Sequence, residues 1–558
     1  MLRLYAARGV SGEAELDYQL QELPKPELMK GLLSAAEDLA ELIIDNNKEL
    51  MILADFDADG ATSCTLLMLG FRALGFTQIS YRVPDRFRFG YGLTPEIVDS
   101  IAETSGDRLP DVIITVDNGI ASVAGVTRAK ELGMDVLITD HHLAPEVLPD
   151  AWHIINPNQP GCNFPCKSLA GVGVAFYLLL ALRTALRERG YFETRAEPNL
   201  AEYLDLVALG TVADIVKLEH TNRLLVAQGL KRIRAGRCRE AIKSLLALGN
   251  RERQYCSATD LGFAVGPRLN AAGRLDDMSL GIEALLEDDP ARALQLSERL
   301  DELNKARRSI ESDMQDQALA VLNEQFDNLQ STDKFGLCLY REDWHQGVVG
   351  LLASRIKERV YRPVIAFAPT EPGSDELKGS ARSIPGVHIR DLLDSIATRY
   401  PEVLSKFGGH AMAAGLSLKR QHFKRFSEYF DESIKELLDG RHPEDEIITD
   451  GPLGDHEMTL ESAREIEFGG PWGQGFEEPL FDGVFTVLNR RNLGDKHLKL
   501  SLATEQGSSI QAIAFFVDEK ILSQSFQRCQ ITYRLSVNRY LDRESVQLII
   551  NHLLPLSS

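Results

Sequence analysis

Carboxylates and histidines follow four short apolar runs in this chain, and these residue types bind divalent cations. The runs are LMILADFDADG (50–60), VIITVDNG (112–119), VLITDHH (136–142) and VALGTVADIV (207–216). Their polar residues are Asp55, Asp57, Asp59, Asp117, Asp140, His141, His142 and Asp214. So many carboxylates are costly to hold together unless cations neutralise them. Oxygen ligands with one or two imidazoles suit Mn²⁺ or Mg²⁺, so the pattern predicts a metal-dependent hydrolase of phosphoesters.

The first three runs must position these groups. They are rich in Val, Ile and Leu on both faces, which is typical of buried strands in a parallel sheet. Open α/β sheets bind ligands at the carboxyl ends of such strands. We therefore expect the acidic and histidine clusters, including the fourth, to meet at strand ends along one sheet edge.

The spacing of the first cluster suggests how two cations could be shared. Alternate positions can project to one side of a strand end, so Asp57 and Asp59 are expected to reach different metals. Asp117 would bridge the metals, and His141 and Asp214 would complete the ligands of the second metal. Two cations about 3.5–4 Å apart can activate water and stabilise the leaving oxygen. The triplet alone also fits a solvated loop or a calcium site, so the prediction depends on all four clusters together.

Length and periodicity predict several domains. At 558 residues the chain is too long for one core. Expected strands alternate with expected helices up to about residue 230, and a long amphipathic helical pattern follows Pro290. In the tail, apolar and polar residues alternate in short segments separated by turns, which is typical of a small β-barrel. We predict an α/β protein with a parallel-sheet domain and accessory helices (1–285), a long connecting helix (286–330), a second α/β domain (331–445) and a β-barrel (446–558).

Charge and targeting signals constrain partners only loosely. The net charge of −21 argues against a nucleic-acid partner, although local basic clusters occur within 82–88, 419–425 and 490–499. No stretch reaches the roughly 18–20 apolar residues of a membrane span. The amino terminus lacks the apolar core of a signal peptide, and the seven cysteines are scattered. We therefore expect a cytoplasmic protein without a membrane partner.

The four clusters resemble the signatures of the DHH phosphoesterase superfamily. They match as D-x-D-x-D-G (55–60), D-N-G (117–119), D-H-H (140–142) and G-T-V-A-D (210–214). Later segments are similar to those of the RecJ family of bacterial exonucleases, namely GYGL (90–93), PRLNAAGR (267–274), DWHQGVVGLLASR (343–355), GSARS (379–383) and GGHAMAAG (408–415). The resemblance covers nearly the whole chain. It implies a DHH domain, a DHHA1 domain and an OB-like barrel in that order.

The resemblance also implies an activity. RecJ-like enzymes are single-stranded-DNA-specific 5′→3′ exonucleases, so we expect release of 5′-mononucleotides by hydrolysis with two Mn²⁺ or Mg²⁺ ions. Roles in DNA recombination, DNA repair and mismatch repair are implied, as are partnerships with single-stranded DNA-binding protein and a RecQ-type helicase.

Individual roles follow from the same resemblance. The implied metal ligands are Asp57, Asp59, Asp117, His141 and Asp214, with Asp55 as an additional ligand. His142 is expected either to contact the scissile phosphate or to orient its neighbours, and Asp140 is expected to orient an imidazole. The implied substrate contacts are Arg86 at the 5′-phosphate, Arg268 along the strand, and Ser380, Arg382 and His410 in the DHHA1 domain.

Several of these residues have simpler explanations. His410 could cap a helix that follows a tight turn at Gly408 and Gly409. Arg382 is expected to lie in a loop bounded by glycine residues. Trp344 is expected to be packed rather than to stack on a base. The tail offers candidate DNA contacts, namely Arg490, Arg491, Lys496, Lys499, Tyr533 and Arg539.

Two alternative functions remain open from the sequence. Another DHH-family phosphodiesterase would act on short oligoribonucleotides, cyclic dinucleotides or pyrophosphate, although such relatives are typically shorter. A non-catalytic single-strand-binding replication component would keep only the scaffold, but such relatives tend to lose carboxylates that are all present here.

Overall fold

The computed structural model divides the chain into two compact units. It describes residues 1–556 except 46–47, 107, 326–333, 405, 444, 495, 505 and 541–542, and only the backbone at 86–87 and 319–325. The first unit comprises Met1–Gly273, Asp277–Asp301 and Ile448–Ser558, and the second comprises Arg274–Asp276 and Glu302–Ile447. No helix within the described ranges is both long and apolar enough to cross a membrane.

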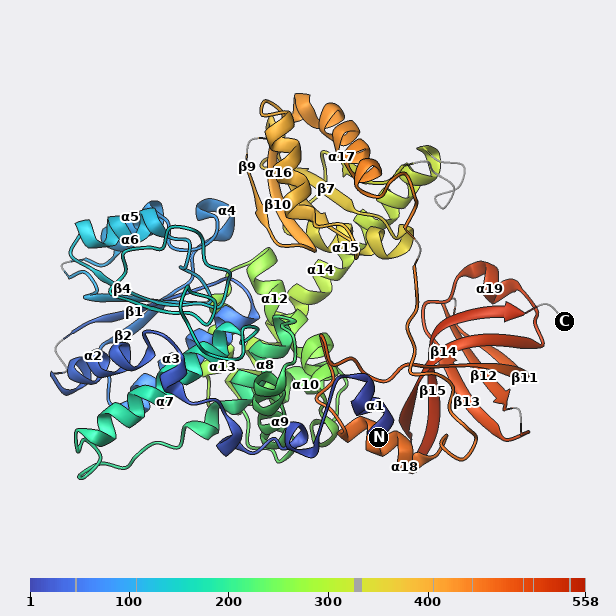
Figure 1. Ribbon diagram of the computed structural model, residues 1–558, viewed down its shortest axis with the longest axis horizontal. Helices are drawn as coiled ribbons and strands as arrows, with labels where there is room; N and C mark the ends of the chain where they lie inside the picture. The colour runs from blue at the N-terminus through green and yellow to red at the C-terminus, as the bar shows by residue number, and fades with distance from the viewer. Residues whose placement is uncertain are drawn as a thin grey trace. The chain divides into compact units, whose positions relative to one another are not determined.

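The first unit contains a five-stranded parallel sheet (Figure 1). Its strands are β1 (Leu50–Ala54), β2 (Ile79–Arg82), β3 (Val112–Val116), β4 (Asp135–Thr139) and β5 (His153–Ile155). They are parallel in the order β2-β1-β3-β4-β5. The chain therefore changes its direction of winding between β1 and β3, and such a switch point opens a ligand crevice at the carboxyl ends. The three buried parallel strands predicted from the sequence are confirmed.

Helices cover both faces of this sheet. Side chains alternate across each strand, so Leu53, Ile113 and Val136 pack against α5 (Pro95–Thr104) and α6 (Val123–Glu131). The opposite face meets α3 (Ala58–Leu74) and α7 (Gly171–Glu188), with α2 (Leu32–Asp45) packed on α7. Two short helices, α1 (Leu2–Ala7) and α4 (Arg86–Phe89), complete the amino-terminal part. Double coverage explains why the central strands are apolar throughout.

The fourth apolar run is not a strand, which corrects the sequence prediction. Residues Leu204–Ala213 form the helix α8, and Asp214 is its C-cap. Residues 204–211 are all buried, so the helix is enclosed on every side and lacks an amphipathic period. A short buried helix and a buried strand have the same apolar signature in the sequence. Asp214 therefore reaches the site from a helix end.

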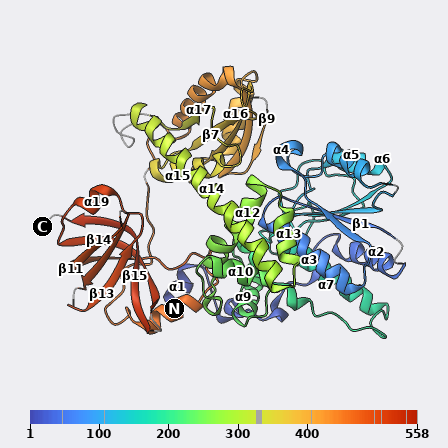
Figure 2. The same cartoon turned by 180° about the vertical axis from the view of Figure 1, so that it is seen from behind.

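Accessory helices lead into the long connecting helix. They are α9 (His220–Arg234), α10 (Glu240–Leu248), α11 (Ala258–Asp260), α12 (Gly266–Leu275) and α13 (Ser279–Leu286), with a π-helical turn at Leu261–Val265 before α12. Helix α14 runs from Pro290 to Gln325 (Figure 2). The backbone N–H of Arg292 donates to Asp289 Oδ1 at 2.8 Å, so Asp289 caps the start of this helix.

The second unit has a mixed sheet of its own. Its strands are β6 (Leu337–Tyr340), β7 (Val364–Pro369), β8 (Glu376–Arg382), β9 (Lys406–Gly409) and β10 (Ala413–Lys419), in the order β6-β7-β8-β10-β9. Only β6 and β7 pair in parallel. Helix α15 (Val349–Val360) packs in one core, and α16 (Ile389–Arg399) and α17 (Phe423–Leu437) pack in another.

Two local predictions in this unit were wrong. Arg382 ends strand β8 rather than lying in a loop, because the residues of GSAR alternate between buried and half-buried positions along the strand. His410 follows β9 in a hairpin, and its backbone N–H donates to Ala413 O at 2.8 Å. No helix follows it directly, so it is not a helix cap. Trp344 is buried as predicted, and its indole N–H donates to Gln317 at 2.9 Å.

The tail is a closed five-stranded barrel, which confirms the predicted architecture. Its strands are β11 (Phe481–Leu493), β12 (His497–Ala503), β13 (Ser509–Ala514), β14 (Arg528–Tyr540) and β15 (Arg543–Leu556). Helix α18 (Leu460–Phe468) packs on β14, and helix α19 (Glu519–Ser523) precedes β14 in the chain. Alternate residues such as Phe485, Leu500 and Leu548 fill the interior.

Candidate active site

The acidic loop after β1 is held by the amino ends of two helices. Asp57 is the N-cap of α3, and its Oδ1 accepts the Gly60 N–H at 3.0 Å. Asp59 is fully buried and accepts the N–H groups of Gly171 (2.7 Å) and Val172 (2.9 Å), at the start of α7. A side chain at Gly171 would lie 2.9 Å from Asp117 Oδ1, so α7 can approach only with glycine there. The positive end of α7 thus faces the carboxylates.

The electrostatics of this cluster favour a bound cation. Burial and then the charge of Asp57 raise the pKa of Asp59 to about 7, even though two amides stabilise its charged form. Burial and then the neighbouring aspartates also raise the pKa of Asp117 and that of Asp214. Carboxylates in such a site stay ionised at neutral pH only when a positive charge compensates them.

The backbone at the end of β3 is strained. Asp117 has φ = 60°, a left-handed conformation that few non-glycine residues adopt. The next side chain supports it, because Asn118 Nδ2 donates to Val116 O (2.9 Å) and Leu53 O (3.3 Å) and so ties β3 to β1. Strain of this kind is typical of functional sites, where surrounding contacts maintain it. The conformation places the carboxylate beside the histidines that follow β4.

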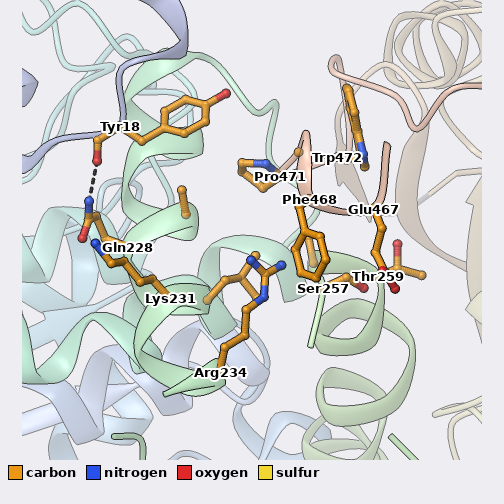
Figure 3. A pocket seen from close by; sticks show the side chains of 14 residues that line it. Tyr18, Gln228, Lys231, Arg234, Ser257, Thr259, Glu467, Phe468, Pro471 and Trp472 are labelled. Atoms are coloured by element: carbon orange, nitrogen blue, oxygen red, sulfur yellow. Dashed lines mark hydrogen bonds between the residues drawn. The ribbon is translucent and has the colours of Figure 1, made fainter. Parts of the chain in front are cut away.

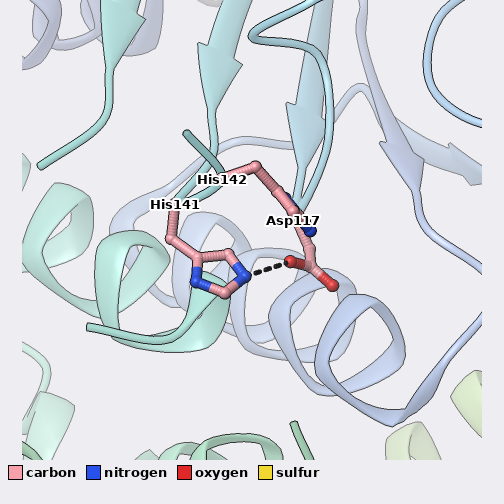
Figure 4. Close-up of side chains that lie close together, drawn as sticks. All are labelled: Asp117, His141 and His142. Atoms are coloured by element: carbon pink, nitrogen blue, oxygen red, sulfur yellow. Dashed lines mark ion pairs between the residues drawn. The ribbon is translucent and has the colours of Figure 1, made fainter. Parts of the chain in front are cut away.

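His141 joins the clusters from three different elements. Its Nε2 lies 3.0 Å from Asp117 Oδ1 (Figure 4) and 3.4 Å from Asp214 Oδ2. Asp117 Oδ1 is buried and accepts no hydrogen bond from the described part of the chain. A separation of roughly 3 Å is that of adjacent ligands about 2.1 Å from an octahedral ion. The predicted ligands Asp117, His141 and Asp214 are therefore brought together.

Asp140 lies behind the histidines and orients them. Its Oδ1 accepts the His142 Nδ1–H and the His141 N–H, both at 2.7 Å, while Oδ2 accepts the Ile120 N–H at 2.9 Å. Burial alone would raise the pKa of Asp140, but the hydrogen bond and charge of His142 outweigh it and lower the pKa. Such a carboxylate fixes the tautomer and the direction of an imidazole. This contact supports the orienting role expected for Asp140.

Two sets of ligand atoms fit two cations. Asp55, Asp57 and Asp117 each place an oxygen within 4.8 Å of the others, and so do the ligand atoms of Asp59, His141 and Asp214. Asp117 also forms a set with His141 and His142, so it adjoins both groups. Hard oxygen ligands, with one imidazole in the second set only, suit Mn²⁺ or Mg²⁺. The donors present therefore fit the predicted pair of metals.

The sequence reasoning missed three residues that support the histidines. Tyr91 Oη lies 3.1 Å from His142 Nδ1 and donates to Asp117 O at 3.1 Å. Asn156 Nδ2 donates to His142 O at 2.9 Å, and Asn158 Nδ2 donates to His141 O at 2.6 Å. Tyr91 lies within the GYGL motif, and the N-P-N sequence that follows β5 was an available signal for the asparagines.

Three predicted substrate residues gather at one end of the second unit's sheet. Ser380 and Arg382 lie on the same side of β8, and Arg382 Nη1 donates to Ser380 Oγ at 3.0 Å. Arg382 pairs with Ala413 across the sheet, and Ala413 closes the hairpin that carries His410. Burial lowers the pKa of the Arg382 guanidinium, and no carboxylate among the described residues forms an ion pair with it. A half-buried cation without a nearby carboxylate is costly, so this strand end favours an anionic ligand.

The structure gives Arg268 a structural role rather than an exposed one. It is buried, its Nε donates to Asp301 Oδ1 at 2.8 Å, and its other nitrogens donate to Ala264 O and Leu248 O. Each of its nitrogens is bonded within the protein, so the substrate role predicted for Arg268 is not supported. The side chain of Arg86 lies outside the described residues, and its predicted role stays a prediction.

The candidate DNA contacts of the barrel separate into residues bonded or buried within the protein and residues that are exposed. Tyr533 is fully buried, Arg490 donates to Ile521 O and Leu522 O, and Arg539 is paired with Glu467. These three therefore stabilise the barrel. Arg491, Lys496 and Lys499 are exposed and remain candidate DNA contacts.

A cavity of about 340 Å³ elsewhere in the first unit contains none of these ligands (Figure 3). Its walls come from α9, α11 and residues 467–472, including Phe468, Pro471 and Trp472. The Arg234 guanidinium lies 5.0 Å from the centre of the Phe468 ring. The cavity lacks paired carboxylates or histidines, so the hydrolytic chemistry belongs to the sheet edge.

Comparison with known proteins gives matches along most of the chain. Family models match as the DHH family N-terminal domain (49–211), the DHHA1 domain (333–436) and the RecJ OB domain (449–552). The single-stranded-DNA-specific exonucleases RecJ of Salmonella typhimurium and Escherichia coli are each 51% identical over 558 residues, covering 99% of this chain and 95% of theirs. These matches confirm the expected fold class.

Solved structures give the same result. The crystal structure of RecJ in complex with Mn²⁺ from Thermus thermophilus has a TM-score of 0.79 and 28% identity, covering 100% of this chain and 76% of that one. The corresponding Mg²⁺ complex has a TM-score of 0.74 and 26% identity, covering 100% and 74%. The metals in these relatives are those that the donor atoms of this chain fit.

Proposed function

Because this chain belongs to the RecJ family of single-stranded-DNA-specific exonucleases, we infer that it is a metal-dependent exonuclease of single-stranded DNA. The observation that carries this function is the convergence of Asp57, Asp59, Asp117, His141 and Asp214 at the switch point of the parallel sheet. A scaffold that only bound DNA would not need to keep so many buried carboxylates, which are costly without cations.

We propose roles for the site residues that follow their geometry. Asp55 and Asp57 hold one Mn²⁺ or Mg²⁺ ion, Asp59, His141 and Asp214 hold another, and Asp117 contacts both. When bound, the two cations activate water and neutralise charge on the phosphoryl group and the leaving oxygen. His142, held by Asp140, donates a hydrogen bond to the scissile phosphate.

The second unit is proposed to bind the substrate. The Arg382 guanidinium can form a forked pair of hydrogen bonds with phosphate, and Ser380 and His410 lie at the same sheet end. Digestion from the 5′ end, release of 5′-mononucleotides and the 5′-phosphate contact of Arg86 are further parts of the proposal. Cytoplasmic action in DNA recombination and repair, with single-stranded DNA-binding protein and a RecQ-type helicase, is expected on family membership alone.

One assay separates this function from its alternatives. The full chain is incubated with Mn²⁺ or Mg²⁺ and with single-stranded DNA, double-stranded DNA or short RNA, each labelled at the 5′ end. We expect immediate release of labelled mononucleotide from single-stranded DNA only. Preferred cleavage of the RNA would indicate the oligoribonucleotide phosphodiesterase, and binding without cleavage would indicate the replication component.

A further inference from the structure

Helix α12 contacts the acidic loop between β1 and α3. Asn270 Oδ1 accepts the N–H of Ala58 at 2.7 Å, although the two residues are 212 positions apart in the sequence. Ala58 is the first residue of α3 and lies between Asp57 and Asp59. The first N–H groups of a helix have no partner within it, and the Asp57 side chain is already bonded to Gly60. Asn270 therefore supplies the acceptor that this helix end lacks.

A second contact from the same helix holds the other side of Asp57. Gly273 lies three residues after Asn270, so both residues are on one face of α12. A side chain built on Gly273 would place its Cβ 1.8 Å from Phe56 O, which is closer than atoms can approach. The helix backbone thus packs directly on the loop backbone. The peptide groups before and after Asp57 are both fixed by α12.

Helix α12 is itself firmly anchored. Arg268, two residues before Asn270 on this helix, is buried and bonded to Asp301 on α14. Two further hydrogen bonds join its guanidinium to Ala264 O and Leu248 O. A residue that orients ligands is effective only when its own position is fixed by packing and hydrogen bonds. Asn270 meets that condition.

We propose that Asn270 is a positioning residue that, with the close packing at Gly273, holds the Asp55–Asp59 loop in its cation-binding conformation. The mutual repulsion of the carboxylates pushes this loop apart when no cation is present, and the bond to Ala58 opposes that movement. The inference rests on the proposed function, because it assigns the cations to this loop. It assigns Asn270 no contact with DNA or with a metal.

The test measures metal binding without DNA. Mn²⁺ is titrated calorimetrically into the full-length protein and its N270A and N270D variants. We expect N270A to raise the Mn²⁺ dissociation constant about 10–100-fold, the usual effect of losing a group that orients metal ligands. Asn270→Asp keeps an oxygen where the Ala58 N–H needs an acceptor. The Mn²⁺ dissociation constant of this variant should therefore stay within about threefold of that of the unaltered protein. A Gly273→Ala variant should weaken binding while Asn270 is intact.

A matched control separates positioning from general damage. Ser257 caps α11 in the same helical segment, where its Oγ accepts the Asp260 N–H at 3.3 Å, and the structure shows it no contact with the acidic loop. Ser257→Ala should lower the melting temperature at least as much as N270A does. Its Mn²⁺ dissociation constant should be unchanged. Unchanged Mn²⁺ binding by N270A would overturn the proposal, and so would equal weakening by S257A or by N270D. If the expected pattern appeared but single-stranded DNA were not cleaved, the positioning role would stand and the proposed function would fail.

Discussion

The carboxylate cluster of the first unit (Asp55, Asp57, Asp59, Asp117 and Asp214) and the basic strand end of the second (Ser380, Arg382 and His410) differ in the sign of their charge. Burial raises the pKa of Asp117 in the first and lowers the pKa of Arg382 in the second. Both shifts reflect the cost of burying a charge. The first site suits cations, and the second is proposed to bind an anion such as a phosphate.

The two sites also differ in how firmly they are held. Asp59 accepts two backbone N–H groups of α7, and Asn118 ties the strand before Asp117 to its neighbour. Arg382, by contrast, is oriented by the Ser380 hydroxyl and the Ala381 carbonyl on its own strand. Catalysis depends on preorganised charge, whereas binding tolerates adjustment. We therefore expect changes in the carboxylate cluster to affect turnover, and changes at the basic strand end to affect affinity.

The largest effect is expected for Asp117→Ala. This variant removes the one carboxylate that adjoins both proposed metal positions, so the turnover rate should fall by about 10³-fold or more. Its fold should persist, because the variant removes a buried carboxylate that its neighbouring aspartates repel. The measurement is mononucleotide release with saturating Mn²⁺, with Asp135→Asn, an exposed residue at the opposite end of β4, as the control. Retention of a tenth of normal activity would show that Asp117 does not bridge the metals.

The sequence predicted this cluster because its main signal is local. Apolar strand residues and the acids that follow them are adjacent in the chain, so Asp55, Asp117 and His141 could be placed at one sheet edge. Asp214 joined the same site from a helix, because its apolar run could not distinguish a buried helix from a strand. Convergence was predicted correctly, although one of the supporting elements was not.

Residues whose role depends on distant partners could not be predicted. Arg268 resembles a DNA contact in its motif, but Asp301 and two carbonyls satisfy its guanidinium. Tyr533 looked like a stacking residue until the closed barrel placed it inside. Asn270 has no charge and no catalytic signature, and only its bond to Ala58 reveals its position. Pairings of this kind arise from tertiary packing and leave no periodic pattern in the sequence.

The second prediction tests the basic strand end. Arg382→Ala should raise the KM for single-stranded DNA about 10–100-fold and leave the turnover rate and the Mn²⁺ requirement nearly unchanged. The KM of Arg382→Lys should lie between those of the unaltered protein and Arg382→Ala, because lysine keeps the charge but cannot form a forked pair of hydrogen bonds with phosphate. Steady-state kinetics at several DNA concentrations provides the measurement. Arg399→Ala, at an exposed pair with Glu436 on the same unit, serves as the control. A fall in turnover at unchanged KM would place Arg382 in the chemical step and remove the contrast between the sites.

A smaller effect is expected for Tyr91→Phe. The variant loses a hydroxyl that donates to Asp117 O and lies beside the His142 ring, so the orientation of that ring becomes less defined. A lost hydrogen bond of this kind lowers the turnover rate about 3–10-fold, with little change in KM. Tyr81→Phe, on β2 of the same sheet, is the matched control. If Y91F changed only the KM, Tyr91 would belong with the residues that bind DNA.

The smallest effect on the KM for single-stranded DNA is expected for Arg268→Ala, although its effect on stability is large. Arg268 and Asp301 form a buried ion pair at 2.8 Å, and breaking such a pair by removing one partner costs about 3–5 kcal/mol. The free energy of unfolding, measured with denaturant, should fall by that amount. The KM for single-stranded DNA, measured where the variant is still folded, should change less than about twofold, because each guanidinium nitrogen of Arg268 is already bonded within the protein. Replacing both partners together (Arg268→Met with Asp301→Leu) should restore much of the stability, since no unpaired charge then remains. A raised KM in both variants would instead show that Arg268 leaves its ion pair to bind the DNA. Arg268 would then have the same role as the one proposed for Arg382.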